Sequence, residues 1–252
     1  MNIRFENIHV ALGGHSILKG IDLEAAHGKI TGIVGPNGCG KSTLLKTLFG
    51  IAPMQSGRIE LNGRDASTLS RREIAAQVGY VGQDIPCVFD FSVRDIVEMA
   101  LYNRRGLSRQ ERRSIVDGAL ESLGVGALAE RSILTLSGGE RKMVFLARAL
   151  AQGVDTIVLD EPTNHLDIRH QLYILDYLRR GGKTILIVLH DLRLAVHFCD
   201  ALYLLHGGTN LAHGVPQEAL TRENIRAAFG VCGYADASDF QIDFSGGIDL
   251  EM

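Results

Sequence analysis

One stretch of this sequence constrains the fold more than any other. Residues 35–42 read Gly-Pro-Asn-Gly-Cys-Gly-Lys-Ser and fit the pattern G-x-x-x-x-G-K-[ST]. They follow a short apolar segment, 29–34, that predicts a buried strand, and they lead into a segment, 41–49, that predicts a helix. A strand, a glycine-rich turn and a helix in this order indicate an α/β protein with a phosphate-binding loop.

The residue types in this phosphate loop (35–42) match the chemistry of phosphate binding. Successive backbone N–H groups can converge on phosphate oxygens only where side chains do not intrude, and glycine provides that freedom. The N-terminus of the following helix adds a partial positive charge. We expect Lys41 to reach the β- and γ-phosphates of a nucleotide, and Ser42 to offer its hydroxyl to Mg²⁺.

Two acidic residues follow another apolar segment. Asp160 and Glu161 come directly after residues 156–159, a predicted buried strand. Because a buried and unpaired carboxylate is costly, we expect a cation nearby. Asp160 is predicted to hold Mg²⁺ through water. Glu161 faces the other way and is predicted to orient or deprotonate an attacking water molecule.

The order of the remaining segments predicts the fold class. From residue 136 onward, predicted helices and strands alternate, which indicates a parallel sheet covered on both faces. The block from about 83 to 140 interrupts this alternation and predicts an inserted helical lobe. We therefore expect an α/β fold over residues 1–232: a P-loop NTPase core with a parallel sheet, an N-terminal antiparallel β subdomain and the lobe. The predicted strands are 3–10, 17–23, 29–34, 57–62, 78–81, 156–159 and 184–189, and the predicted helices of the core are 41–49, 138–151, 168–180 and 192–198.

Charge and composition exclude several classes of protein. A net charge of −3 argues against a general nucleic-acid binder, which needs a basic stripe. No apolar run approaches the ~20 residues that span a bilayer, and the alternating N-terminus does not resemble a signal peptide, so we expect a cytoplasmic chain. Four cysteines without a close pair argue against a zinc site or a disulfide scaffold.

The last segment, 233–252, has five acidic and no basic residues and predicts a loosely held acidic tail. The arginines of the block 104–113 are predicted to form a solvated helix surface: Arg104, Arg105, Arg109, Arg112 and Arg113.

Three weaker signals narrow the class of nucleotide-binding protein. The run 136–140, Leu-Ser-Gly-Gly-Glu, is a second glycine-bearing turn at a helix start and lies shortly before the acidic pair. Gln83 follows the predicted strand 78–81 and could complete a Mg²⁺ shell or touch the attacking water. His190 ends the strand 184–189 and could bond a γ-phosphate. Each feature alone is commonly structural, so the conclusion depends on their order.

With these residues in place, the sequence closely resembles the ATP-binding-cassette (ABC) ATPases over about residues 1–230. The family's motifs stand in order: the glutamine loop at Gln83, the signature at 136–140, Walker B with the catalytic Glu161, the D-loop ending in Asp167, and the switch His190. The Walker A residues that the resemblance implies for ATP binding are Gly35, Pro36, Asn37, Gly38, Cys39, Gly40, Lys41, Ser42 and Thr43.

The resemblance also implies an assembly and a role. It implies a homodimer around two ATP molecules, each between one chain's Walker A and the other chain's Ser137, Gly138 and Gly139, with Asp167 nearby. Mg²⁺ would be held by Ser42, Gln83 and Asp160. Residues 160–171 and 206–230 resemble the ATPase subunits of importers for iron–siderophore complexes, haem and cobalamin. Such a subunit binds the inner face of the cell membrane through an integral-membrane permease docked near Gln83, and the permease receives its cargo from a substrate-binding protein.

Two other readings stay open at this stage. An ATPase of the same fold could serve iron–sulfur cluster assembly without a permease, whereas a small-molecule kinase would leave residues 137–139 and His190 idle. The chain also departs from the importer pattern, with Ala-Leu-Tyr-Asn-Arg at 100–104 in place of a Gly-Arg-x-Pro-like segment, and Leu189 in place of a small hydroxyl residue.

Cys39 is unusual inside such a loop. It lies beside Lys41 and a helix N-terminus, and both favour the thiolate form of cysteine. The sequence therefore predicts a thiol that maleimide alkylates and that Mg-ATP protects.

Leu12 leads to a prediction about nucleotide preference. The turn at Gly13 and Gly14 aligns Leu12 with the position where the family commonly stacks an aromatic ring on adenine. Since stacking on a base contributes about 1–3 kcal/mol, we expect GTP to be hydrolysed nearly as well as ATP. Leu12→Tyr should tighten ATP several-fold and widen the preference over GTP, as measured by nucleotide titration of both proteins. A strong ATP preference in the wild type, unchanged in Leu12→Tyr, would mean that another residue contacts the base.

Overall fold

The computed structural model describes residues 2–83, 88–164, 166–236 and 239–242, and its centre is a six-stranded sheet. The strands lie in the order β10-β9-β3-β8-β7-β6; all neighbours are parallel except the edge pair β9 and β10. Every residue of β3, β7 and β8 is buried, which explains why these strands read as continuous apolar runs. The bounds are β3 (Ile30–Val34), β6 (Val78–Val81), β7 (Thr156–Asp160), β8 (Thr184–Val188), β9 (Ala201–His206) and β10 (Thr209–Gly214).

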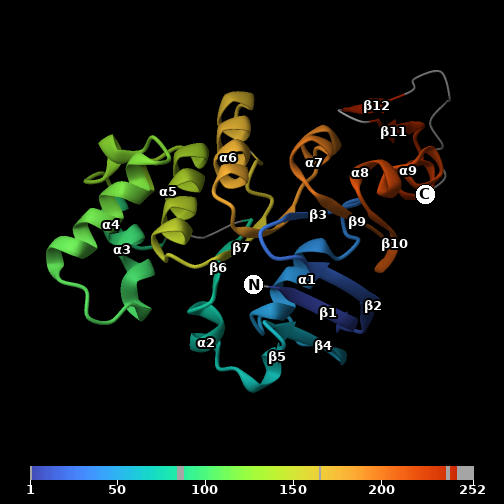
Figure 1. The fold of residues 1–252 in the computed structure, drawn as a ribbon, viewed down its shortest axis with the longest axis horizontal. Helices are drawn as coiled ribbons and strands as arrows, with labels where there is room; N and C mark the ends of the chain where they lie inside the picture. The colour runs from blue at the N-terminus through green and yellow to red at the C-terminus, as the bar shows by residue number, and fades with distance from the viewer. Residues whose placement is uncertain (1, 84–87, 165, 237–238, 243–252) are drawn as a thin grey trace.

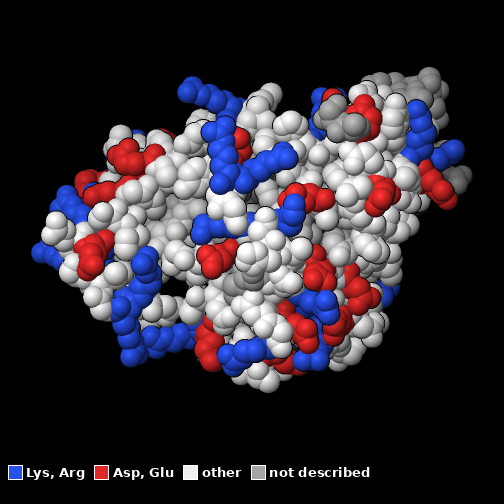
Figure 2. Space-filling view, in the orientation of Figure 1, with Lys and Arg blue, Asp and Glu red and all other residues white. Residues whose placement is uncertain are grey.

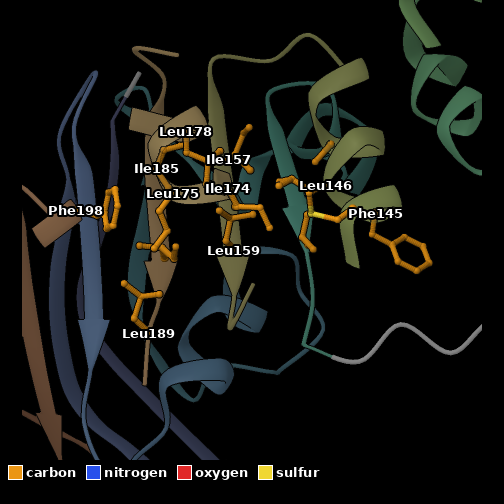
Figure 3. Packing of buried hydrophobic residues seen from close by; sticks show 14 of the residues in the cluster. Phe145, Leu146, Ile157, Leu159, Ile174, Leu175, Leu178, Ile185, Leu189 and Phe198 are labelled. Carbon is orange, nitrogen blue, oxygen red and sulfur yellow. The ribbon is translucent and has the colours of Figure 1, made fainter. Parts of the chain in front are cut away.

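Helices cover one face of this sheet, and a helix with a second sheet covers the other (Figure 1). Alternate residues of β7 show the arrangement: Ile157 and Leu159 join the apolar cluster of the helical face, whereas Val158 joins the cluster of the opposite face. On the helical face, Ile174 and its neighbours from one helix lie against Ile157 and Ile185 (Figure 3). Burial on both faces leaves the strand ends as the accessible parts of the sheet.

The second sheet is antiparallel and comes from the first part of the chain. Its order is β2-β1-β4-β5, with β1 paired to both β2 and β4. Its inner side chains share a cluster with Leu44 and Leu45 of α1, the helix that follows the phosphate loop. The bounds are β1 (Ile3–Leu12), β2 (His15–Ala25), β4 (Ser56–Leu61) and β5 (Arg64–Asp65).

The segment between β6 and β7 contains the expected helical lobe, at the left of Figure 1. It is a series of short helices, and α5, which begins at Gly138, packs against α3 and α4. Serine caps start α3, α4 and α5, each closed by a carboxylate three residues later. The lobe helices are α3 (Val93–Glu98), η2 (Met99–Asn103), α4 (Arg109–Glu121), η3 (Gly126–Leu128), η4 (Ile133–Thr135) and α5 (Gly138–Ala151); the others are α1 (Lys41–Leu48), η1 (Ala66–Thr68), α2 (Arg71–Ala75), α6 (Ile168–Arg180), α7 (Leu192–Phe198), α8 (Pro216–Ala219) and α9 (Arg222–Phe229).

The predicted fold class is confirmed: a mixed α/β core with a parallel-rich sheet and an antiparallel N-terminal sheet. The predicted strand and helix positions agree with the structure within one or two residues at most ends. Within the described residues, none of the helices has the length and apolar character that crossing a bilayer requires.

The structure differs from the expectation of a loose tail after residue 232. β11 (Gly233–Ala235) and β12 (Phe240–Ile242) form an antiparallel hairpin. Phe240 and Ala235 are buried in the main apolar cluster, and the backbone N–H of Ala235 donates to the carbonyl of Leu220. The acidic composition hid this hairpin, because two buried apolar residues are enough to anchor it. Residues 243–252 lie outside the described part of the chain.

Candidate functional site

The phosphate loop connects β3 to α1, and glycines fix its two ends. Gly35 has φ +148°, and a Cβ there would lie 2.1 Å from the carbonyl oxygen of Leu205. Gly40 has φ +103°, and a Cβ there would lie 2.4 Å from Cδ2 of Leu18. Only glycine fits these two positions, so the first and last glycines of the motif are required by packing as well as by backbone conformation.

Lys41 is buried within this loop. Its Nζ donates hydrogen bonds to the carbonyl oxygens of Gly35 and Pro36, both at 2.8 Å. These bonds satisfy an ammonium that burial would otherwise destabilise. Phosphate oxygens placed over the loop are stronger acceptors than carbonyls, so Lys41 is available to exchange one set of partners for the other.

Ser42 and Asp160 meet below the loop. Ser42 Oγ donates to Asp160 Oδ1 at 2.9 Å, which joins the start of α1 to the end of β7. The other carboxylate oxygen, Oδ2, is buried without a hydrogen-bond partner. Burial is the main cause that raises the pKa of Asp160, and the charge of Glu161 adds to it, while the bond from Ser42 opposes it. A hydroxyl and an unsatisfied carboxylate oxygen are hard oxygen ligands, so these two residues fit Mg²⁺ or its water.

Glu161 is held by two side chains. It is buried and has φ +52°, a left-handed conformation that is uncommon for glutamate and turns the chain sharply after β7. One carboxylate oxygen, Oε1, is bonded to Nε2 of His190, and the other, Oε2, accepts from Nδ2 of Asn164. Both oxygens therefore accept one hydrogen bond each, which fixes the carboxylate in place, and each oxygen keeps a second lone pair that can face water.

One cavity is lined by most of the residues predicted to bind the phosphates or to activate water. It has a volume of about 400 Å³ and opens onto the phosphate loop. Gln83 and Glu161 lie on its wall beside the loop, and Ile17 of β2 adds an apolar surface. Leu12, at the exposed end of β1, is not among the lining residues. The lining residues are Ile17, Asn37, Gly38, Gly40, Lys41, Ser42, Thr43, Gln83 and Glu161.

The other predicted binding residues lie elsewhere in the chain. Ser137, Gly138, Gly139 and Asp167 line a separate groove of about 740 Å³ between the start of α5 and the start of α6. Ser137 caps α5: its side-chain oxygen accepts a hydrogen bond from the backbone N–H of Glu140. This bond fixes the geometry of the backbone at the N-terminus of α5. None of these four residues lines the cavity at the phosphate loop. Within one chain the predicted site is thus divided into two halves.

The structure does not favour the thiolate form expected for Cys39, and its alkylation by maleimide stays a prediction. Its side chain is only 5% exposed, and burial raises the pKa of the thiol. The ammonium of Lys41 opposes this shift, but it is the smaller effect, since Lys41 is already bonded to two carbonyls. The sequence indicated which groups are near but not how completely the loop encloses the sulfur.

Sequence reasoning missed two side chains of this region. Asn164, three residues after Glu161, bonds its carboxylate, and only the turn that follows β7 brings it back. Lys142, one turn into α5, donates to the backbone carbonyls of Gly82 and Gln83 at 3.4 and 3.1 Å. An amide close to an acidic pair is a weak sequence signal for the first contact. The second depends on how α5 packs beside β6.

Comparisons with known proteins show the family to which this chain belongs. The family model described as "ABC transporter" matches residues 18–164. The hemin import ATP-binding protein HmuV of Bradyrhizobium diazoefficiens is 38% identical, over 90% of this chain and 88% of its own. The iron(3+)-hydroxamate import ATP-binding protein FhuC of Bacillus subtilis is 37% identical, over 90% and 87%. A solved dimeric bacterial ABC transporter cassette is 26% identical with a TM-score of 0.78, over 84% of this chain and 98% of its own.

The unsatisfied Asp160 leads to a stability prediction for the nucleotide-free protein. A carboxyl whose pKa is raised by folding destabilises the fold once the pH is high enough to ionise it. Asp160→Asn removes this charge and can still accept from Ser42, so it should melt at a higher temperature than wild type at neutral pH. Each 1 kcal/mol corresponds to about 2–4 °C in a chain of this size.

The pH dependence provides the control. The difference in melting temperature should shrink as the pH falls below the ordinary aspartate pKa of about 3.9, where this carboxyl is neutral in both the folded and the unfolded state. Mg-ATP should stabilise wild type but not Asp160→Asn. A less stable Asp160→Asn at neutral pH would show that the protein already compensates the charge of Asp160.

Asn164 leads to a kinetic prediction. A hydrogen bond to a charged group contributes about 1.5–3 kcal/mol, so Asn164→Ala should lower kcat roughly tenfold or more and leave the KM for ATP nearly unchanged. Asn164→Asp keeps the shape but replaces the donor with an acceptor, and should be at least as slow. Steady-state phosphate release measures both variants. Wild-type kcat in Asn164→Asp would rule out the donor as the functional group.

Proposed function

This chain is an ATPase of the ABC transporter family, and we propose that it is the ATP-hydrolysing subunit of a membrane importer for a metal chelate such as an iron–siderophore complex, haem or cobalamin. Support for the substrate class comes from the relatives, whose names state hemin and iron(3+)-hydroxamate import and which align over nearly their whole length. An ATPase for iron–sulfur assembly without a permease has no comparable support.

The observation that carries the proposal is the division of the site. The phosphate loop and Glu161 lie in one cavity, whereas Ser137, Gly138 and Gly139 lie in another groove of the same chain. A nucleotide in the first cavity would be open to water on one side. A second copy in head-to-tail orientation would supply its residues 137–139 to cover that side, so two copies would form two complete sites.

The chain's own groups suggest how hydrolysis begins. Lys41 would leave the carbonyls of Gly35 and Pro36 for the phosphates, and Ser42 with Asp160 would hold Mg²⁺. Bound Mg²⁺ would neutralise charge that develops on the phosphates. His190 would turn from Glu161 toward the γ-phosphate, which frees one carboxylate oxygen to accept the proton of the attacking water.

Three exposed apolar side chains that follow Gln83 in the chain suit docking of a permease. Val88, Phe89 and Tyr102 are 78%, 70% and 78% exposed, which is unusual for large apolar side chains in a folded domain. They follow Gln83 in the chain, so a partner seated there would be coupled to the nucleotide cavity. We propose that this surface holds the subunit at the inner face of the cell membrane. Residues 84–87 of this region lie outside the described part of the chain.

Glu161→Gln tests the catalytic part of the proposal. The variant should bind ATP and form a stable dimer, while hydrolysis falls by about 10²–10⁴-fold because the general base is lost. Size-exclusion chromatography with Mg-ATP and phosphate release measure the two effects. Turnover within about threefold of wild type would contradict the role of Glu161.

A mixed dimer tests the shared site. Lys41→Ala and Gly138→Asp should each abolish activity as homodimers. One chain of each kind places both defects in one site and leaves the other complete. Activity in both parent homodimers would contradict the shared site, and an inactive mixed dimer would show that the two sites are not independently competent. Co-purification from detergent-solubilised membranes should recover a polytopic partner; soluble scaffold proteins instead would favour the assembly role.

A further inference from the structure

Five arginines from two distant parts of the chain gather beside the proposed docking surface. This arginine cluster consists of Arg71 and Arg72 of α2, Arg104 and Arg105 after η2, and Arg109 at the start of α4. Figure 2 shows Lys and Arg side chains gathered between the lower end of the helical lobe and α2. All five are exposed except Arg104, which is half-buried.

Contacts of Arg72 join the two parts into one surface. Arg72 Nε donates to Asn103 Oδ1 at 3.2 Å, and its guanidinium lies 5.8 Å from the centre of the Tyr102 ring. Arg112 of α4 donates to the carbonyl of Arg104 at 3.5 Å, which ties the first turns of α4 to this loop. Arg71 donates to the carbonyl of Gly50 at 3.2 Å, beside the exposed Ile51. The cluster therefore borders the apolar surface at Tyr102.

Within residues 2–83, 88–164, 166–236 and 239–242, none of the five arginines forms an ion pair with a carboxylate. The adjacent acids Glu73 and Glu111 accept from Ser70 and Ser108, and these bonds lower the pKa of each carboxyl. Arg109 also lies at the first position of α4, where a cation opposes the helix dipole. Helix stability therefore does not explain this arginine, whereas an external anion would.

We propose that the arginine cluster binds the anionic phospholipid headgroups of the membrane that surrounds the permease. The inference rests on the proposed function for one step. When a permease is docked at Val88, Phe89 and Tyr102, these side chains and the arginine cluster beside Tyr102 face the inner leaflet. Four of the five side chains are exposed, and exposed cations on one face can contact a plane of phosphates.

The remaining charge of the chain strengthens the argument. The net charge is −3, so an anionic bilayer repels most of the molecule and attracts this face. Lipid contact would thus orient the subunit as well as hold it. The alternative, a complementary acidic loop of the permease itself, would not require lipid and is separated from the proposal by the experiment.

The test measures vesicle binding by the full chain without any permease. Wild type is sedimented with vesicles of phosphatidylcholine alone and with vesicles half phosphatidylglycerol. Each Lys or Arg near an anionic surface strengthens binding about fivefold. We expect binding only to the anionic vesicles, weakening as salt is raised. Arg71→Gln/Arg105→Gln/Arg109→Gln should reduce the partition coefficient roughly a hundredfold.

A matched control removes the same charge from other faces. Lys19→Gln/Arg180→Gln/Arg193→Gln should bind anionic vesicles at least half as well as wild type, and melting curves of both triple variants verify folding. Equal binding to both vesicle types, or equal loss in both variants, overturns the proposal. Permease capture in lipid-free detergent tests the proposed function separately. If the cluster variant loses the permease there but keeps its vesicle binding, the cluster contacts protein and the lipid proposal fails.

Discussion

Burial of both faces of the central sheet is the constraint on which the site depends. With α5, α6 and α7 on one face and α1 with the antiparallel sheet on the other, polar chemistry can be placed only where strands end. The parallel strands β3, β6, β7 and β8 end at one edge, so the phosphate loop, Gln83, Glu161 and His190 follow them there. Residues far apart in the chain meet because the fold offers one accessible edge.

In this structure the reactive groups satisfy one another. Lys41 is bonded to its own loop, Asp160 to Ser42, and Glu161 to His190 and Asn164. These pairs avoid the cost of buried charges without a ligand, yet each is weaker than the contact that a phosphate or a cation would provide. Asp160 Oδ2 has no hydrogen-bond partner among the described residues, and it lies where a divalent cation is expected. Ligand binding is thus an exchange of partners within a site that is already in place.

Sequence alone predicted the elements whose chemistry is local. Gly35 and Gly40 are required by backbone geometry, and the acids at 160 and 161 follow an apolar strand, so their positions could be read directly. The state of Cys39 could not be predicted, because its pKa depends on how far the surrounding loop excludes water. The hairpin at Phe240 was hidden for a related reason: composition averaged two buried residues with many acids. The contact of Lys142 with Gly82 and Gln83 is made through packing and has no signature at a fixed spacing, whereas that of Asn164 had only a weak one.

The hydrogen bonds from Lys142 to the carbonyls of Gly82 and Gln83 link α5 to the residues that follow β6. Gly138 lies four residues earlier on the same helix, about 6 Å along its axis, while the ammonium of Lys142 holds the backbone at Gln83. A tilt of the helical lobe that moves Gly138 therefore also displaces the backbone at Gln83, after the end of β6. If each half-site belongs to a different nucleotide, this link couples movement of Gly138 at one nucleotide to the backbone of Gln83 at the other.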